Sequence, residues 1–398
     1  MDKEAIMIFG VGPLQQSIIE RCKLKGLYTI GIDPAVNAVG RDTVDLFEVI
    51  DGQDYERTLN LAKKYRISGI ITAATDKPLV MMARIAETLQ LPFYSVETAQ
   101  NSTDKFLMKK KFQEYKIACA KGYILNNIKE LSNIDIDYPV IIKPRDNSGS
   151  RGVFYCKDYF SVESSFNEVL QYTKKGSILI EEYIKGKEYS VESVHYEGKT
   201  YVVQITEKIT TEFPYNVELG HIQPAELTDD VKNRIVHIVF QMSKALNYQN
   251  CVSHTELKIN LNNITIIEVS PRLGGDFITS KLVPFSTGIY IEDLLIDISV
   301  GNRLNKNDFI PKINKSSGIV YFELSEGKIC QIGDLSQLNR INGIEMFTFL
   351  LSRGDIVNKI KNSMDRYGFA IFKNDNREEL LLNIDLCKKE LKKQINII

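Results

Sequence analysis

The alternation of strand and helix patterns in the first hundred residues constrains the fold of this 398-residue chain more than any other feature. Short apolar runs alternate with amphipathic stretches, the runs at 5–9, 28–33, 46–50 and 69–72 and the stretches at 14–25, 55–65 and 79–89. Strands that alternate with helices are typical of a parallel sheet covered on both faces. We therefore expect a doubly wound α/β domain over residues 1–98, which closes near the Pro-Phe-Tyr at 92–94.

The pattern changes after residue 98. A helix start at 99–102 and a basic helix at 105–115 precede a hairpin-rich region with one long helix at 229–246. The strands that we expect in this region lie at 138–143, 152–156, 177–182, 188–196, 201–209, 254–261 and 264–269. Strands separated from helices predict an α+β domain, here over 99–305. A C-terminal segment, 306–398, begins again with a strand at 318–322 and ends in a charged amphipathic helix at 377–393.

Composition excludes several classes of protein. The 50 Lys and Arg nearly balance the 51 Asp and Glu, a net charge of −1, which argues against a nucleic-acid partner. No apolar run approaches the length of a membrane span, and the charged residues 1–4 lead into a strand rather than a signal peptide. We expect a cytoplasmic protein without a membrane partner. The six cysteines have no C-x-x-C spacing, which argues against a zinc site: Cys22, Cys119, Cys156, Cys251, Cys330 and Cys387.

A glycine turn follows the first expected strand. Gly10 and Gly12, with Asp33 about twenty residues later, imitate a dinucleotide-binding turn. However, Gln15 stands where the third glycine is needed, and Pro13 removes an amide that would bind phosphate. The sequence therefore favours a tight turn that binds no nucleotide.

Residues 138–153 form a stronger candidate site. A strand delivers Lys143 and is followed by the small and polar residues of 145–152. Such a loop can close its amides over phosphate oxygens while the lysine supplies a positive charge. The alternative is an ordinary hairpin connection, but eight residues are long for one and a lysine in a buried strand is costly. We favour phosphate binding.

Residues 178–190 combine an apolar strand with three acids. Backbone groups from Glu182 to Ile184 are suited to an adenine edge, and Glu188 can accept both hydroxyls of a ribose. Taken alone, this segment is better explained by acids at the end of an edge strand.

Residues 254–276 predict a hairpin that pairs two acids. With a three-residue loop at 261–263, Glu256 lies opposite Glu268, whereas a two-residue loop would put the two acids on different faces. Alternation then assigns one face to Glu256, Lys258, Glu268 and Ser270, and the other to Leu257, Ile259, Ile267 and Val269.

Opposed carboxylates need neutralisation. Like charges directly opposite on a sheet are destabilising, and two carboxylates with a neighbouring oxygen are suitable ligands for Mg²⁺ bound to phosphates. Arg272, just before a Gly-Gly turn, is then placed to stabilise a phosphoryl group or an oxyanion. The alternative is a single acid in water at the sheet edge.

In this order and spacing, the four segments resemble the ATP-grasp superfamily of ligases over nearly the whole chain. The resemblance is to amino-acid and dipeptide ligases and to the ATP-binding domain of the carbamoyl-phosphate synthase large chain. It implies phosphate-binding lysines at Lys105 and Lys143, metal carboxylates at Glu256 and Glu268, and a phosphoryl-stabilising Arg272. It further implies a mobile lid loop containing Ser148, Gly149, Ser150 and Gly152, an adenine hinge of Glu181, Glu182, Tyr183 and Ile184, and a ribose contact at Glu188. Ser270 departs from the usual Glu-x-Asn and offers one hydroxyl oxygen as a metal ligand.

The resemblance also implies a reaction. ATP, with Mg²⁺ or Mn²⁺, phosphorylates a small-molecule carboxylate, and an amine displaces phosphate to form an amide; a homodimer is one expected assembly. Residues 206–225 are similar to amino-acid ligases, in which an equivalent histidine lies beside the acyl-phosphate. His221 is therefore the candidate catalytic residue that orients the substrate, with a structural role as the alternative and His254 as the competing histidine. Two alternatives stay open: a purine-pathway enzyme of the phosphoribosylglycinamide synthetase or phosphoribosylaminoimidazole carboxylase type, and a non-catalytic nucleotide-binding module.

Overall fold

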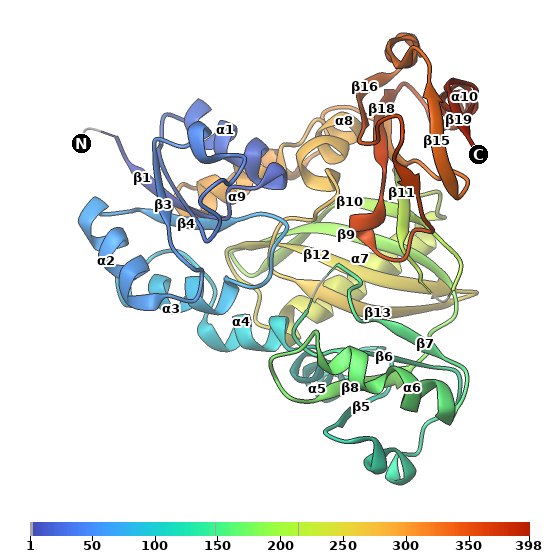
Figure 1. Ribbon diagram of the computed structural model, residues 1–398. Coiled ribbons are helices and arrows are strands. Elements are labelled where there is room, and N and C mark those ends of the chain that lie inside the picture. The colour runs from blue at the N-terminus through green and yellow to red at the C-terminus, as the bar shows by residue number, and fades with distance from the viewer. Residues whose placement is uncertain (1–2, 148, 214) are drawn as a thin grey trace.

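Three lobes surround a large antiparallel sheet in the computed structural model, which describes residues 3–147, 149–213 and 215–398. Figure 1 shows an N-terminal lobe in blue, a small lobe in green and a C-terminal lobe in orange and red. The first lobe is a parallel α/β unit and the rest is antiparallel with separate helices, so the predicted fold class is confirmed. The domain boundaries at 98 and 305 stay predictions.

The N-terminal lobe is a parallel sheet in the order β3-β2-β1-β4. Its strands are β1 (Ala5–Phe9), β2 (Tyr28–Asp33), β3 (Leu46–Val49) and β4 (Gly69–Thr72), and its helices are α1 (Gln16–Leu24), α2 (Tyr55–Tyr65) and α3 (Leu79–Leu89). Ile6 and Ile8 pack in the cluster that contains α1, while Met7 and Phe9 pack with α2 and α3. This alternation buries β1 on both faces, as the sequence predicts.

The glycine turn after β1 is held by the protein itself. Gly10 has φ of 85°, and the Asp33 carboxylate accepts a hydrogen bond of 3.0 Å from the Val11 N–H. Asp33 therefore stabilises the turn.

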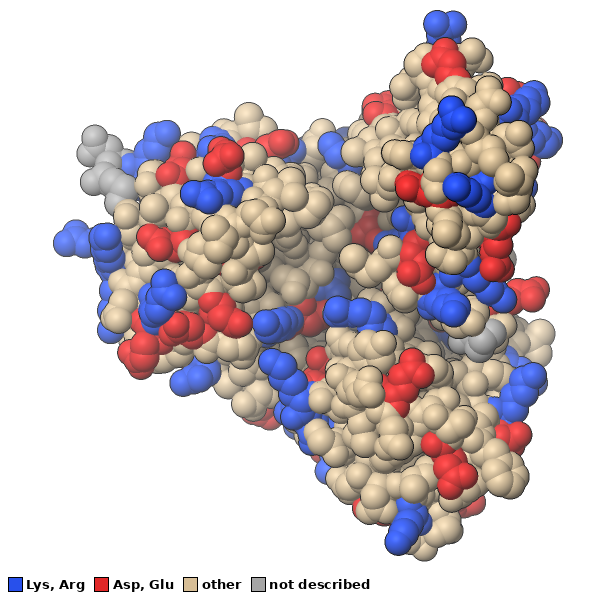
Figure 2. All heavy atoms as spheres, in the orientation of Figure 1, with Lys and Arg blue, Asp and Glu red and all other residues tan. Residues whose placement is uncertain are grey.

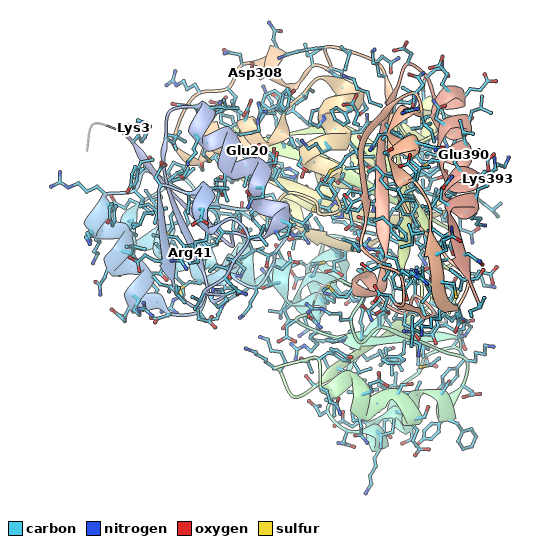
Figure 3. All side chains as sticks on the ribbon, turned by 45° about the horizontal axis from the view of Figure 1, so that its top comes forward. Lys3, Glu20, Arg41, Asp308, Glu390 and Lys393 are labelled. Carbon is cyan, nitrogen blue, oxygen red and sulfur yellow. The ribbon has the colours of Figure 1, made fainter. Side chains whose placement is uncertain are left out.

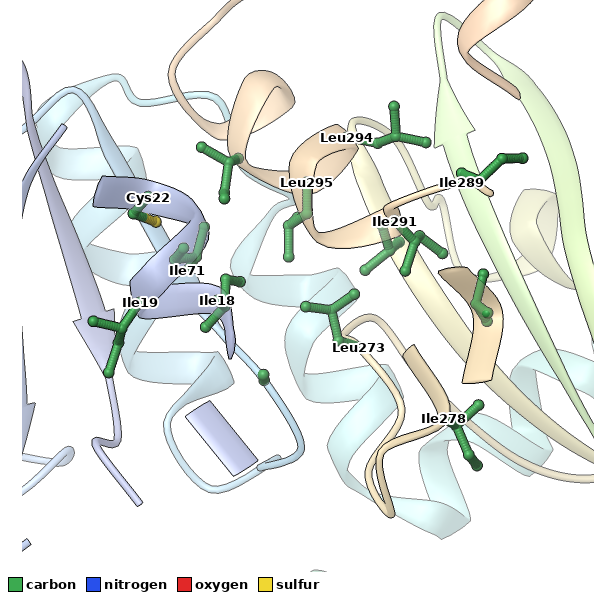
Figure 4. Packing of buried hydrophobic residues seen from close by; sticks show 14 of the residues in the cluster. Ile18, Ile19, Cys22, Ile71, Leu273, Ile278, Ile289, Ile291, Leu294 and Leu295 are labelled. Carbon is green, nitrogen blue, oxygen red and sulfur yellow. The ribbon is translucent and has the colours of Figure 1, made fainter. Parts of the chain in front are cut away.

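One helix from later in the chain returns to the N-terminal lobe. Of α8 (Val283–Thr287) and α9 (Ile291–Ser299), it is α9 that lies against α1 and β4, while α8 lies against the central sheet. Ile18 of α1 shares a core cluster with Leu273 and Leu295 (Figure 4). The Lys25 ammonium lies 2.8 Å from the Asp297 carboxylate at the edge of this contact. Packing therefore crosses the predicted boundary between the first two domains.

The small lobe is an antiparallel sheet in the order β5-β8-β6-β7. Its strands are β5 (Gly122–Leu125), β6 (Val140–Pro144), β7 (Phe154–Cys156) and β8 (Ile178–Glu182), covered by α6 (Tyr159–Leu170) and preceded by α4 (Val96–Thr103) and α5 (Lys105–Glu114). The predicted helix start at 99–102 is wrong, because Ser95 caps the helix through its hydroxyl, 3.1 Å from the Thr98 N–H.

The central sheet has the order β13-β12-β9-β10-β11-β14-β18-β16 and is antiparallel throughout. Its strands are β9 (Lys187–Tyr196), β10 (Lys199–Thr210), β11 (Glu218–Gln223), β12 (Cys251–Asn260), β13 (Asn263–Ser270), β14 (Ser316–Tyr321), β16 (Ile344–Phe349) and β18 (Gly368–Asn374). Helix α7 (Asp229–Ala245) covers one face. Strands of the predicted C-terminal segment thus continue the sheet of the preceding domain.

The C-terminal lobe adds a small sheet of β17 (Ile356–Val357), β15 (Gly327–Ile332) and β19 (Ile395–Ile397), and the helix α10 (Arg377–Gln394). Figure 3 shows Glu390 and Lys393 on the outer side of α10, where they form an ion pair of 2.6 Å. In the part of the chain that the structure describes, no helix is both long enough and apolar enough to cross a membrane.

The β12–β13 hairpin reaches the predicted pairing by a different route. Asn260 pairs with Asn263, so the loop has two residues, Leu261 and Asn262, and the predicted three-residue loop is wrong. A β-bulge then inserts Ile267, which restores the register and leaves Glu256 opposite Glu268, as predicted. Ile266 takes the core position, and Ile267 lies on the cavity side instead of on the predicted core face.

Candidate active site

A cavity of about 520 Å³ lies where the central sheet meets the other lobes, a volume typical of small-molecule sites. Figure 2 shows the molecule hollowed between its lobes, with basic and acidic side chains around the hollow. The cavity brings together most of the predicted site residues: Lys105, Lys143, Gly149, Ser150, Glu181, Glu182, Tyr183, Ile184, Glu188, His221, Glu256, Glu268 and Arg272. Gly152 and Ser270 do not line it, and Ser148 lies outside the described residues.

One buried carboxylate holds the strand lysine. Glu181 at the end of β8 pairs with Lys143 of β6 and, at 2.6 Å, with Lys109 of α5, and all three side chains are buried. Burial alone would raise the pKa of Glu181, but Lys109 and Lys143 lower it to about 2. Burial, with the nearby Lys109, lowers the pKa of Lys143 in spite of the ion pair. The Glu181 side chain therefore fixes Lys143 at the cavity wall.

The second lysine lies at the start of α5. Asp104 caps this helix by accepting a hydrogen bond of 3.0 Å from the Phe106 N–H, and the next residue, Lys105, points to the opposed acids. The Lys105 ammonium lies 2.9 Å from the Glu268 carboxylate and donates a hydrogen bond of 2.7 Å to the Asn147 carbonyl. Lys105 thus links β13 to the loop that follows β6.

Among the described residues of that loop, three have positive φ. Gly149 and Ser150 line the cavity with φ of 71° and 55°. Gly152 has φ of 76°, and a Cβ there would lie 2.7 Å from the Tyr172 ring. Gly152 is therefore required for the return into β7 rather than for contact with the cavity.

The far end of the cavity is aromatic. The rings of Tyr155, Tyr183 and Phe213 lie within about 5 Å of one another, with centroids 4.7 to 5.0 Å apart. Lys258 lies 5.1 Å from the Tyr183 ring and 3.5 Å from the Glu188 carboxylate. An apolar wall beside a carboxylate suits a base attached to a sugar.

The opposed acids are each paired with a lysine. Lys208 of β10 lies 3.0 Å from Glu256 and 3.3 Å from Glu218, while Lys105 neutralises Glu268. Although burial opposes it, Lys208 lowers the pKa of Glu256 well below its ordinary value. Glu256 is therefore ionised, as a metal ligand must be.

The donor set of these acids fits Mg²⁺. The ion typically takes one or two carboxylates and completes its shell with water and phosphate oxygens. Among the described residues no group of three or more His, Cys, Asp or Glu side chains gathers as a metal site. The cavity therefore offers the ion two carboxylates and is lined by lysines. This arrangement suits an ion that binds together with a polyphosphate, and it does not suit a site in which the protein supplies every ligand.

His254 lies behind this pair of acids. Its Nδ1 is 2.6 Å from a carboxylate oxygen of the fully buried Glu192, and its Nε2 is 3.6 Å from Glu256. Burial would lower the pKa of His254, but Glu192 and Glu256 raise it to about 9. A Cβ at Gly274 would lie 2.7 Å from the His254 ring, so a glycine is needed there.

Arg272 is held by the N-terminal lobe. Its guanidinium donates two hydrogen bonds, of 2.9 and 3.0 Å, to the two oxygens of Asp76 in the loop after β4. The Ser270 hydroxyl also donates to Asp76, which ties Ser270 to the same carboxylate as Arg272. Burial opposes ionisation of Asp76, yet Arg272 keeps its pKa below the ordinary value.

His221 of β11 completes the wall beyond Arg272. Its Nε2 lies 3.2 Å from Asp276, and the same carboxylate accepts two hydrogen bonds, of 2.7 and 2.9 Å, from Arg366 of the C-terminal lobe. The guanidinium of Arg366 also stacks 3.7 Å above the Tyr321 ring. His221, Asp276 and Arg366 all line the cavity.

Sequence reasoning assigned no site role to several charged residues, among them Asp76, Lys208, Asp276 and Arg366. Asp76 had a usable signal, because it follows the carboxyl end of a parallel strand, where α/β sheets bind ligands. Asp276 follows Arg272 by four residues in the same turn. Lys208 and Arg366 carry no local signal, since only the order of strands in the central sheet brings them to the cavity.

Comparison with known proteins identifies two domains in the chain. Residues 136–280 match the ATP-grasp domain, and residues 320–396 match the L-amino acid ligase C-terminal domain 2. The first segment contains Lys143 and Arg272, and the second contains Arg366.

Two curated relatives match at low identity. Alanine–anticapsin ligase of Bacillus amyloliquefaciens is 26% identical over 269 residues, which cover 61% of this chain and 56% of that protein. The carbamoyl phosphate synthase large chain of Clostridium acetobutylicum is 23% identical over 366 residues, 83% of this chain and 33% of that protein. The chain thus spans little more than half the length of the first relative and a third of the second.

Solved structures share the fold over the whole chain. An L-amino acid ligase from Bacillus licheniformis has a TM-score of 0.83 at 20% identity and covers 100% of this chain and 98% of its own. A phosphoribosylglycinamide synthetase from Anaerococcus prevotii has a TM-score of 0.75 at 23% identity and covers 100% of both chains. Identities this low show the fold alone.

Proposed function

We propose that this chain, which contains an ATP-grasp domain and an L-amino acid ligase C-terminal domain, is an ATP-dependent ligase that joins a small carboxylate to an amine. One observation carries the proposal. A single cavity contains two lysines suited to bind phosphate, two opposed carboxylates and an arginine whose guanidinium is hydrogen-bonded to the Asp76 carboxylate. Phosphoryl transfer needs positioning and neutralisation of charge rather than a covalent intermediate on the enzyme, and this set of side chains supplies both.

The proposal assigns ATP to the side of the cavity formed by the small lobe. Lys105 and Lys143 would hold phosphate oxygens, and the loop containing Gly149 and Ser150 would close over them. The N–H groups of Glu182 and Tyr183 donate to the carbonyls of Lys121 and Pro139. The adenine edge would therefore meet the next N–H, that of Ile184, and Glu188 would accept the ribose hydroxyls. These roles agree with an apolar, aromatic wall at the same end.

Glu256 and Glu268 would hold Mg²⁺ against the polyphosphate, with Mn²⁺ as a substitute. When bound, the ion would supply positive charge that neutralises the phosphate oxygens. Lys208 and Lys105, which neutralise these acids in the structure, would turn to the phosphates as the ion takes their place.

The reaction has two steps. An oxygen of the substrate carboxylate attacks the γ-phosphorus, the bond to ADP breaks, and Arg272 stabilises the transferred group. The amine then attacks the carbonyl carbon, the bond to phosphate breaks, and the amine loses one proton. Because Asp76 accepts from two nitrogens of Arg272, the guanidinium keeps a fixed orientation through both steps.

Amino acids are the substrates that the proposal favours. The support is the L-amino acid ligase domain at 320–396 and the match to a protein named for joining alanine to anticapsin. A cytoplasmic location and a homodimer stay predictions of the sequence.

The test is ADP release measured with pairs from a panel of amino acids. We expect release only when a carboxylate and an amine are both present, with one ADP for each amide formed. ATP binding without turnover on any pair would contradict the proposal. Release of ADP with phosphoribosylamine and glycine alone would favour the purine-pathway alternative.

A further inference from the structure

The second step of the proposed reaction needs a base. An amino group is largely protonated near neutral pH, and it becomes a nucleophile only after it loses that proton. Lysine and arginine side chains act here as cations, and the opposed acids are committed to the ion and the phosphates. Among the cavity residues, a histidine is the side chain whose ordinary pKa suits proton transfer near neutral pH.

His221 has the hydrogen-bond pattern of such a group. A carboxylate can only accept, so the contact of 3.2 Å between Asp276 and Nε2 puts the ring proton on Nε2. In the neutral imidazole the other nitrogen then carries a lone pair. That nitrogen, Nδ1, is buried and has no hydrogen-bond partner among the described residues, although its residue lines the cavity.

Arg366 and the backbone fix Asp276 in place. The two hydrogen bonds from Arg366 use both carboxylate oxygens, while one of these oxygens also faces His221. Burial opposes ionisation, but His221 and Arg366 hold the pKa of Asp276 far below its ordinary value. Asp276 has φ of 50°, so this carboxylate extends from a turn of defined shape, four residues after Arg272.

The cations around His221 are paired with acids. Lys208 of β10 and Ile319 of β14 are its partners in the neighbouring strands, and Asp276 and Arg366 lie on the cavity side. The Lys208 charge is taken by Glu256 and Glu218, and the Arg366 charge by Asp276. Each neighbouring cation thus pairs with an acid, and Nδ1 is the ring nitrogen of His221 without a partner among the described residues.

We propose that His221, oriented by Asp276, removes the proton from the attacking amine, and that Arg366 of the C-terminal lobe is the positioning residue of this pair. The inference rests on the proposed ligase function. The nitrogen–carbon bond forms, the bond from carbonyl carbon to phosphate oxygen breaks, and the proton passes from nitrogen to Nδ1 of His221. The departing phosphate or water then receives it, so the histidine returns to its starting state.

The experiment compares two nucleophiles on the variant Asp276→Asn. Hydroxylamine is already unprotonated at neutral pH and traps an acyl-phosphate without help from a base, whereas an amino acid needs one. Asparagine tolerates the left-handed backbone at this position, and its amide can donate to Nε2 and move the ring proton to Nδ1. We expect amide formation to fall about 100- to 10,000-fold, the usual contribution of a general base. Hydroxamate formation should stay within about threefold of the wild type, because it does not use the base.

Asp293→Asn is the matched control. Asp293 also forms an ion pair with both nitrogens of an arginine, Arg21, but between α1 and α9 and away from the cavity. This variant should keep both activities. Equal losses of amide and hydroxamate in Asp276→Asn, or no loss in either, would overturn the inference. If the wild type forms no hydroxamate with any carboxylate, the proposed function itself fails, which is a different result.

Discussion

Replacing Glu181 by glutamine tests whether a buried carboxylate holds the ATP-side lysine. The side chain of Glu181 pairs with Lys109 and Lys143, and each of the three residues is less than a twentieth exposed. Glu181→Gln keeps the shape of the side chain but leaves two buried ammonium groups facing a neutral amide. We therefore expect a large loss of stability and weaker binding of ATP.

The size of the loss follows from the pKa. Lys109 and Lys143 overcome the effect of burial and hold the pKa of Glu181 near 2 instead of the ordinary 4.5, which corresponds to about 3 kcal/mol in favour of the charged form. Removal of one partner from a buried ion pair costs about 3 to 5 kcal/mol, so the two routes agree. Because burial already lowers the pKa of Lys143, release of its proton in the variant limits the loss to the lower figure.

The effect of Glu181 on the unfolding free energy depends on pH in a known direction. A lowered pKa stabilises the folded protein fully above the ordinary 4.5 and loses this effect as the pH falls toward 2. The difference in unfolding free energy between wild type and Glu181→Gln should therefore be about 3 kcal/mol near neutral pH and about 1 kcal/mol near pH 3.

Urea unfolding of the two proteins across this pH range is the assay, with Glu182→Gln as control. Glu182 is the next residue and accepts one hydrogen bond of 2.9 Å from the Lys121 N–H, so its change should cost about 1 kcal/mol or less at every pH. A Glu181→Gln protein within about 1 kcal/mol of the wild type at neutral pH would refute the reasoning.

Two further changes test the other side of the cavity. Glu268→Gln removes one of the opposed acids, so turnover at ordinary Mg²⁺ should fall about 100-fold or more and recover in part at high Mg²⁺. Turnover at the wild-type rate would refute the metal role. The control is Asp297→Asn, on the outside of α9. Asp76→Asn removes the partner that orients Arg272, so kcat should fall about 100-fold while KM for ATP stays nearly unchanged. A rise in KM alone would show that Asp76 acts on ATP binding instead.

The N-terminal lobe is the part of the fold that the sequence predicts best. Its strands and helices agree with the expected positions within two residues, because both faces of β1 are apolar and each connection is short. Strand β5 and helix α6 of the small lobe were not predicted from the sequence. Three of the four residues of β5 are only half-buried, so it carries little apolar signal.

The hairpin shows why a correct pairing can rest on a wrong loop. Sequence alone offers a loop length, and the register follows from it, but a β-bulge adds a residue without any local signature. Ile267 is that extra residue, and an isoleucine there looks like every other isoleucine of the strand.

The site is predictable where its residues are close in sequence and not where distant strands meet. Lys143, Glu181 and Arg272 each lie in a short motif, and the structure brings them to one cavity. Arg366 reaches Asp276 only because β14 and β18 follow β11 in the central sheet, an order that no pattern in the sequence encodes.

The central claim is that the carboxylate is activated as an acyl-phosphate, and the fate of its oxygen tests this most directly. An amino-acid substrate labelled with heavy oxygen in its carboxylate is turned over with ATP, Mg²⁺ and an amine, and the inorganic phosphate is analysed by mass. The account predicts one labelled oxygen in each phosphate released, in proportion to ADP. Amide formation with unlabelled phosphate would contradict it.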